Sequence, residues 1–193
     1  MSESSSSLKR EALPQDLEAY KREAQRVSKQ AFAQQRPHPF LLYARSTLWD
    51  RTLLLARAAG AGAGRGTQLV SYDIPVGGLS FLSPIRKRQS EGDPSVILLG
   101  RSTDNDVIVP VPSVSSRHAT FTLDAQRNTW TVTDLGSTNG TFFGEERMTP
   151  QKPYDLRDGS YLRLGGNLIA WFFAPGRMWE VLLDTAQLNK LID

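Results

Sequence analysis

Apolar and polar residues alternate with a period of two in the second half of the chain. The alternation is clearest in two runs, 118–123 and 129–133, whose apolar residues fall on one face and whose threonines fall on the other. The apolar positions are Ala119, Phe121, Leu123, Trp130 and Val132. This period is typical of strands that bury one face. Because the residues between the two runs are polar, we predict a β-hairpin.

Other segments of the second half show the same strand-like pattern. Further strands are predicted at 95–99, 107–109, 141–143, 147–148, 161–164 and 167–173, with 153–156 as another candidate. Asp158-Gly159 and Gly165-Gly166 supply turns beside the last of them. Many short strands at close spacing favour a mainly β protein, an antiparallel β-sandwich.

The N-terminal part of the chain has a helical period instead. Between Pro14 and Pro37, apolar residues recur every three or four positions and predict a helix over 15–35. The stripe consists of Leu17, Tyr20, Ala24, Val27 and Ala31. Because this stripe is narrow and rich in alanine, it would make a poor coiled coil. We expect the helix to dock on its own domain or to present the stripe to a partner.

The remaining segments are less regular. Residues 40–43 suit a buried strand and 48–58 suit a short helix, but periodicity alone cannot assign runs this short. The glycine-rich run 60–66 is typical of a flexible connector. The serine-rich segment 1–14 is expected to be a disordered tail. At the other end of the chain, 178–191 predicts a helix packed on the edge of the sandwich.

Composition limits the classes of function. The 193 residues suffice for one domain and an attachment, and a net charge of +3 argues against a nucleic acid or a membrane as partner. The tight basic run 86–88 lacks interleaved aromatic residues, so we interpret it as a solvated strand end. The chain has no cysteine and two distant histidines, His38 and His118, which predicts neither a metal site nor a cofactor. Without a signal-peptide pattern or a membrane-length apolar run, we expect a cytoplasmic protein.

Three short motifs follow one another in the strand-rich part. They are Gly100-Arg101, a Ser-x-x-His element from Ser115 to His118, and a glycine-flanked turn over 136–141. Together they place a guanidinium, several hydroxyls and an amide in loops between strands. A guanidinium fork matches two oxygens of a phosphate, and hydroxyls and amides can bind both the phosphate and the peptide that carries it. The motifs therefore predict a site that binds a phosphorylated segment.

An enzyme is the competing interpretation, because Ser115, His118 and Asp134 supply the residue types of a catalytic triad. Serine and histidine three residues apart at a loop–strand junction do not suit the triad geometry. The chain also has no Gly-x-Ser-x-Gly elbow and no phosphate-binding Gly-x-x-x-x-Gly-Lys loop. We therefore predict no catalytic residues.

These motifs, in this order on a β-rich stretch, resemble the forkhead-associated (FHA) family of phosphothreonine-binding domains. The resemblance implies an FHA/SMAD-like sandwich of about eleven strands, with an N-terminal helical extension and a short C-terminal helix. The pattern predicts fewer than eleven strands, and the remaining ones would lie at 68–74 and 79–86, so the domain would start near Gly66. The predicted division is a disordered tail at 1–14, a helical extension and linker at 15–65, an FHA domain at 66–176 and a C-terminal helix at 177–193.

The resemblance also implies a role for each motif residue. The implied phosphate ligands are Arg101, Ser115, Ser116 and Thr138. The implied peptide contacts are Arg117 and Asn139. The implied structural residues are Gly100, Gly140 and His118, whose ring would hold the binding loops in place. Selectivity for the residue three positions after the phosphothreonine would depend on loop residues, with Asp104, Arg127 and the 144–149 turn as candidates that the motifs do not separate.

The function implied is an adaptor in serine/threonine-kinase signalling that binds a phosphothreonine-containing protein, with a kinase or its substrate as candidates. The alternative is a phosphate-independent FHA scaffold for protein–protein or homotypic assembly. Such scaffolds usually lose the arginine or the serine, whereas this chain keeps Arg101 and Ser115. The region before Gly66 keeps the alternative open, because it lies outside the resemblance.

Overall fold

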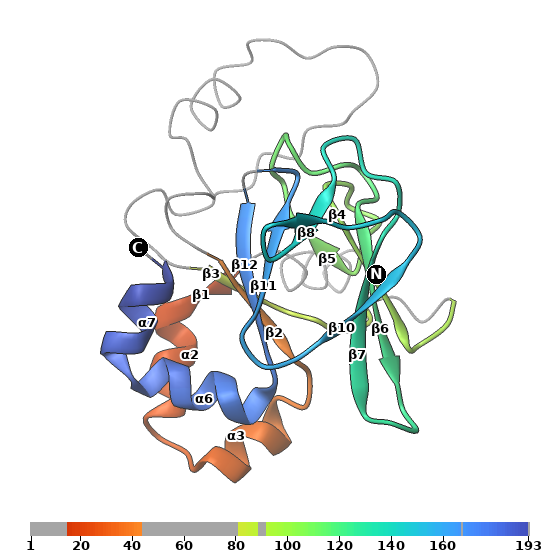
Figure 1. Ribbon diagram of the computed structural model, residues 1–193. Coiled ribbons are helices and arrows are strands. Elements are labelled where there is room, and N and C mark those ends of the chain that lie inside the picture. The colour runs from red at the N-terminus through yellow and green to blue at the C-terminus, as the bar shows by residue number, and fades with distance from the viewer. Residues whose placement is uncertain (1–14, 44–80, 89–91, 167, 193) are drawn as a thin grey trace, which may run out of the picture.

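The computed structural model describes residues 15–43, 81–88, 92–166 and 168–192. These residues form two β-sheets packed face to face, with the helices grouped on one side of the sandwich (Figure 1). The protein is therefore mainly β, as the period-two pattern predicts.

The larger sheet has seven strands in the order β1-β3-β2-β12-β11-β8-β9. In that order the strands are β1 (Gln15–Asp16), β3 (Phe81–Pro84), β2 (Phe40–Tyr43), β12 (Leu168–Phe173), β11 (Ser160–Leu164), β8 (Thr141–Phe143) and β9 (Glu146–Arg147). All neighbours in this sheet are antiparallel.

The smaller sheet has five strands in the order β10-β7-β6-β4-β5. The strands are β10 (Pro153–Leu156), β7 (Thr129–Asp134), β6 (Ala119–Asp124), β4 (Val96–Gly100) and β5 (Val107–Ile108). The predicted hairpin is confirmed, with Phe121 of β6 opposite Val132 of β7. The expectation of a wholly antiparallel sandwich is wrong for one pair, because β4 and β5 are parallel. The loop 101–106 must therefore run back along β4 before β5 begins.

The main hydrophobic core lies between the two sheets. It is built from alternate residues of the strands, including Leu99, Phe121, Val132, Leu162 and Ala170, all of which are fully buried. This arrangement follows from the period of two, since successive side chains of a strand point to opposite faces.

A second core lies between the outer face of the seven-stranded sheet and the helices α2 (Leu17–Ala24), α3 (Lys29–Gln35), α6 (Pro175–Leu183) and α7 (Thr185–Ile192). Strand β2 contributes to both cores: Leu41 and Tyr43 face the first, whereas Phe40 and Leu42 face the second. Burial on both faces explains why 40–43 is continuously apolar and does not alternate. The N-terminal helices thus dock on the chain's own domain.

The helix predicted over 15–35 is interrupted. Helix α2 ends at Ala24, and α3 begins after Ser28, whose Oγ accepts a hydrogen bond from the Ala31 N–H at 3.2 Å. Serine at this position caps the new helix. The break changes the helical phase, so that Phe32 is buried in the second core and Ala31 is not.

The C-terminal helix predicted over 178–191 is also two helices. Asp184 separates α6 from α7, and its Oδ1 accepts a hydrogen bond from the Gln187 N–H at 3.0 Å. Both helices pack over the outer face of the larger sheet rather than along its edge. Trp179 of α6 donates through Nε1 to the Ala24 and Val27 carbonyls at 3.1 and 3.2 Å, which joins the two ends of the chain.

Strand β2 precedes the expected start of the sandwich near Gly66, yet it pairs with both β12 and β3. A start near Gly66 therefore leaves out a central strand of the larger sheet. The four-segment division as a whole stays a prediction. The expected elements at 1–14, 48–58, 60–66 and 68–74 lie outside the described residues.

Candidate functional site

The first motif lies where β4 ends beside the loop that carries the second motif. A Cβ atom at Gly100 would lie 2.4 Å from the Ser116 carbonyl oxygen, so only glycine allows the two segments to approach this closely. The Arg101 N–H donates to the Ser115 carbonyl at 2.9 Å, and the Ser102 N–H donates to the Ser116 carbonyl at 3.1 Å. Gly100 thus brings Arg101 next to the Ser-x-x-His element.

The Arg101 side chain is partly held in place. Its Nε donates to the Val114 carbonyl at 3.1 Å. In the described part of the chain this is the one side-chain hydrogen bond of Arg101, so its terminal nitrogens can donate to a ligand. A guanidinium oriented in advance loses less conformational freedom when it binds an anion.

Ser115 and Thr138 bring the second and third motifs together. The Ser115 Oγ accepts a hydrogen bond from the Thr138 N–H at 3.0 Å and donates to the Thr138 Oγ1 at 3.3 Å. Ser115 is half-buried and Thr138 is exposed. Through Arg101, Ser115 and Thr138, the three motifs form one surface.

Three other predicted site residues are exposed: Ser116, Arg117 and Asn139. The Ser116 carbonyl serves the loop contacts described above, and Asn139 donates through Nδ2 to the Ser113 carbonyl at 2.9 Å. The implied phosphate and peptide roles of these residues stay predictions.

His118 is fully buried beneath the loops. Its ring Nδ1 accepts a hydrogen bond from the Ser115 N–H at 3.1 Å, and its backbone N–H donates to the Leu99 carbonyl at 2.9 Å. Burial lowers the pKa of His118, although the Asp134 carboxylate and the Gly140 backbone act in the opposite direction. A neutral ring is what an accepting Nδ1 requires. His118 therefore holds the Ser115 loop against β4.

The buried Asp134 carboxylate holds the 136–141 turn of the third motif through hydrogen bonds. Its Oδ1 accepts from the Ser137 Oγ and the Thr141 Oγ1, both at 2.6 Å, and its Oδ2 accepts from the Gly136 and Ser137 N–H groups at 2.9 and 3.0 Å. Burial raises the pKa of Asp134, but the four hydrogen bonds to the carboxylate outweigh burial and hold it below its ordinary value. Sequence reasoning missed this role, although an aspartate two residues before a glycine turn is a signal for it.

Two further residues fasten the loops to one another. Asn105 is buried and donates through Nδ2 to the Ser102 and Ser116 carbonyls at 2.8 and 2.7 Å. Gly165 donates to the Gly140 carbonyl at 3.0 Å, and a Cβ atom there would lie 2.2 Å from the Ser113 carbonyl oxygen. Asn105 was not singled out from the sequence, and Gly165 was predicted only as part of a turn.

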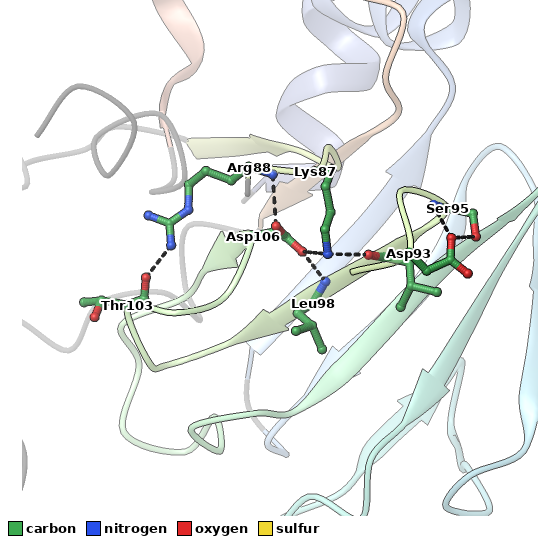
Figure 2. Close-up of polar contacts among 8 residues, drawn as sticks. Lys87, Arg88, Asp93, Ser95, Leu98, Thr103 and Asp106 are labelled. Atoms are coloured by element: carbon green, nitrogen blue, oxygen red, sulfur yellow. Dashed lines mark hydrogen bonds and ion pairs between the residues drawn. The ribbon is translucent and has the colours of Figure 1, made fainter. Parts of the chain in front are cut away.

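Figure 2 shows the buried carboxylate of Asp106, which anchors the loop 101–106 that begins with Arg101. Asp106 accepts from the Leu98 and Arg88 N–H groups, both at 2.9 Å, and forms an ion pair with Lys87 at 3.2 Å. Arg88 in turn donates to the Thr103 carbonyl inside the loop. The basic run 86–88 is therefore not simply a solvated strand end, since Lys87 and Arg88 anchor the loop.

The geometry does not form a catalytic triad. His118 is bonded to the Ser115 backbone N–H and not to its Oγ, and the Asp134 carboxylate is occupied by the 136–141 turn. Within the described ranges, no group of three or more potential ligand side chains could hold a metal ion. No helix in those same ranges is long and apolar enough to span a membrane.

The hydroxyls, the amide and the guanidinium of the three motifs thus lie on adjoining, hydrogen-bonded loops of a β-sandwich. Residues 97–165 match the family model of the FHA domain. This stretch of the chain is an FHA domain, and FHA domains are phosphopeptide-binding modules rather than catalytic domains.

Several curated proteins and solved structures are similar to the chain. The E3 ubiquitin-protein ligase DMA2 of Saccharomyces cerevisiae is 33% identical over 102 residues, which cover 44% of this chain and 19% of DMA2. The FHA domain-containing protein PS1 of Arabidopsis thaliana is 29% identical over 92 residues, covering 45% of this chain and 6% of PS1. The chain thus spans about a fifth or less of the length of these relatives.

Among solved structures, one from an analysis of phosphothreonine-dependent FHA domain interactions is 20% identical with a TM-score of 0.41, covering 70% of this chain and 95% of that chain. The FhaA FHA domain complexed with the intracellular domain of Rv3910 is 23% identical with a TM-score of 0.39, covering 69% of this chain and 98% of that chain.

Proposed function

We propose that this chain binds a phosphothreonine-containing segment of a partner protein and acts as an adaptor in serine/threonine-kinase signalling. The observation that carries the proposal is the convergence of Arg101, Ser115 and Thr138 on adjoining loops. The hydrogen bonds that Thr138 and Arg101 donate to Ser115 support it, because they hold the three residues at one surface.

The chemistry of the three residues fits a phosphate monoester. A phosphorylated side chain carries about −1.5 to −2 charges at neutral pH and presents three acceptor oxygens. Arg101 offers charged donors, and the Ser115 and Thr138 hydroxyls offer neutral donors that add no second buried charge. Asn139 and Arg117, exposed beside them, are the proposed contacts to the peptide.

The proposal also covers the phosphorylated residue and the partner. We expect phosphothreonine to be preferred over phosphoserine, and a serine/threonine kinase or one of its substrates to be the partner. The experiment is a binding screen of the full chain against an oriented phosphothreonine peptide library. Matched phosphoserine and unphosphorylated libraries serve as controls.

The expected result is selection from the phosphothreonine library alone, with dissociation constants in the micromolar range, about −8 kcal/mol. Equal retention of the unphosphorylated library would contradict the proposal and favour a phosphate-independent scaffold. Equal retention of the phosphoserine library would keep phosphate binding but remove the preference for threonine.

A further inference from the structure

A second arginine lies against the turn of the third motif. Arg147 of β9 is opposite Phe142 of β8, and Gly140 immediately precedes β8. A Cβ atom at Gly140 would lie 2.7 Å from the Arg147 Nε and 3.0 Å from its Nη2. The guanidinium therefore lies on the α-carbon of Gly140, in space that any other residue would fill.

The guanidinium charge of Arg147 has no ion-pair partner within the part of the chain that the structure describes. Its side chain is exposed, and among the residues that the structure describes it makes no ion pair and no side-chain hydrogen bond. Arg163 of β11, on the other side of β8, differs, because its guanidinium lies 4.1 Å from the centre of the Phe142 ring and 4.0 Å from the Glu145 carboxylate. Arg147 is thus a permanent positive charge with donors available to a ligand.

The position of this charge relates it to the proposed binding surface. Gly140 follows Thr138 and Asn139, and Thr138 is hydrogen-bonded to Ser115. Arg147 belongs to β9, which pairs with β8 directly after this turn, whereas Arg101 follows β4 of the other sheet. A peptide that crosses the turn would meet two cationic groups at separate points.

We propose that Arg147 selects phosphothreonine segments that carry an acidic residue, Asp or Glu, close to the phosphothreonine. This inference rests on the proposed function, because the same peptide must occupy the site. A carboxylate matches the planar fork of the guanidinium with two parallel hydrogen bonds. The contact is at an exposed position, so the selectivity is modest and depends on salt.

The test uses the full chain and labelled phosphothreonine peptides of otherwise neutral sequence. Each peptide carries one Glu, at one of the three positions on either side of the phosphothreonine, and a matched peptide has Gln there. Affinities are measured by fluorescence anisotropy for wild type, Arg147→Gln and Arg147→Lys. Arg157→Gln is the control, because Arg157 is an exposed arginine on the β10–β11 turn.

At one position or two neighbouring positions, wild type and the Arg157 variant should bind the Glu peptide roughly two- to fivefold more tightly than the Gln peptide. Arg147→Gln should abolish this ratio, because it weakens binding of the Glu peptides more than binding of the Gln peptides. Arg147→Lys should keep part of the ratio, since the charge remains but the fork is lost.

An equal Glu-to-Gln ratio for wild type and Arg147→Gln at every position would overturn the inference. Arg101→Ala, measured in parallel, separates this failure from a failure of the proposed function. If Arg101→Ala abolishes binding and Arg147 has no effect on the ratio, only the acidic selectivity is wrong. If no peptide binds in a phosphate-dependent way, both proposals are wrong.

Discussion

At the scale of single residues, several motif positions are explained by how closely two backbones approach. Gly100 allows contact with the Ser116 carbonyl, and Gly140 leaves room for the Arg147 guanidinium in addition to having a positive φ of 81°. His118 is explained by its buried ring, whose Nδ1 accepts a hydrogen bond from the Ser115 N–H. These residues shape the surface on which Arg101 is presented.

The first prediction concerns His118→Ala. The change leaves the partly buried Ser115 N–H without its acceptor, which should cost about 1–3 kcal/mol of unfolding free energy. We expect a lower melting temperature in differential scanning calorimetry. His38→Ala is the comparison, because His38 is only half-buried. Unchanged melting together with abolished phosphopeptide binding would mean that His118 acts on the ligand directly.

The second prediction concerns pH. Burial lowers the pKa of both His118 and His38 from 6.5, with Arg86 as a second cause at His38. As the pH falls below 6.5, the unfolded chain therefore takes up protons before the folded one, and stability decreases. The pKa of Asp134 is lowered from 3.8, so its contribution is lost only at still lower pH. The unfolding free energy from urea titrations should be lower at about pH 5.5 than at about pH 7.5; equal values would contradict this.

At the scale of elements, local patterns could be predicted from the sequence and non-local contacts could not. The β6–β7 hairpin requires only alternating apolar residues and a polar turn, so it could be predicted from its own sequence. The role of Asp106 depends on the parallel pairing of β4 with β5 and on Lys87, which is 19 positions away. The helix breaks after Ala24 and at Asp184 were missed because a continuous apolar period does not reveal a capping residue in its middle.

The third prediction tests the anchor of the Arg101 loop. Asp106→Asn removes the charge that pairs with Lys87, and the Lys87 side chain is only 21% exposed. Removing one partner of a buried pair should cost about 3 kcal/mol of stability. We also expect weaker phosphopeptide binding, since the Asp106 cluster holds the loop that follows Arg101. Asp155→Asn, an exposed aspartate on β10, is the control. Equal stability of Asp106→Asn and wild type in urea would contradict the assignment.

At the scale of the whole molecule, the two ends of the chain complete the sandwich together. Helices α2 and α3 pack with α6 and α7 over one sheet face, and β2 lies between β3 and β12 (Figure 1). The FHA signature covers the loops of the proposed site but not the helices α2, α3, α6 and α7 or strand β2, because the signature lies within 97–165. The apolar run 40–43 was recognised as a buried strand, yet its place in the sheet depends on pairing with distant residues.

The fourth prediction follows from this arrangement. A chain that starts at Gly66 lacks β2, whose four side chains are fully or almost fully buried. At about 1.5–3 kcal/mol for each such side chain, this loss is comparable with the whole stability of a typical domain, about 5–15 kcal/mol. We expect no cooperative melting for this fragment, whereas a chain starting at Gln15 should melt like the full chain. Identical cooperative melting of all three would contradict the account.

The central claim is that the three motifs form a site for a phosphate, with Arg101 as its charged ligand. The most direct measurement is isothermal titration calorimetry of wild type and Arg101→Ala with one phosphothreonine peptide from the screen. Arg157→Ala and the unphosphorylated peptide are the controls. We predict that Arg101→Ala weakens binding by roughly 2–5 kcal/mol, while Arg157→Ala has no effect. Equal affinity of wild type and Arg101→Ala for the phosphopeptide would contradict the claim.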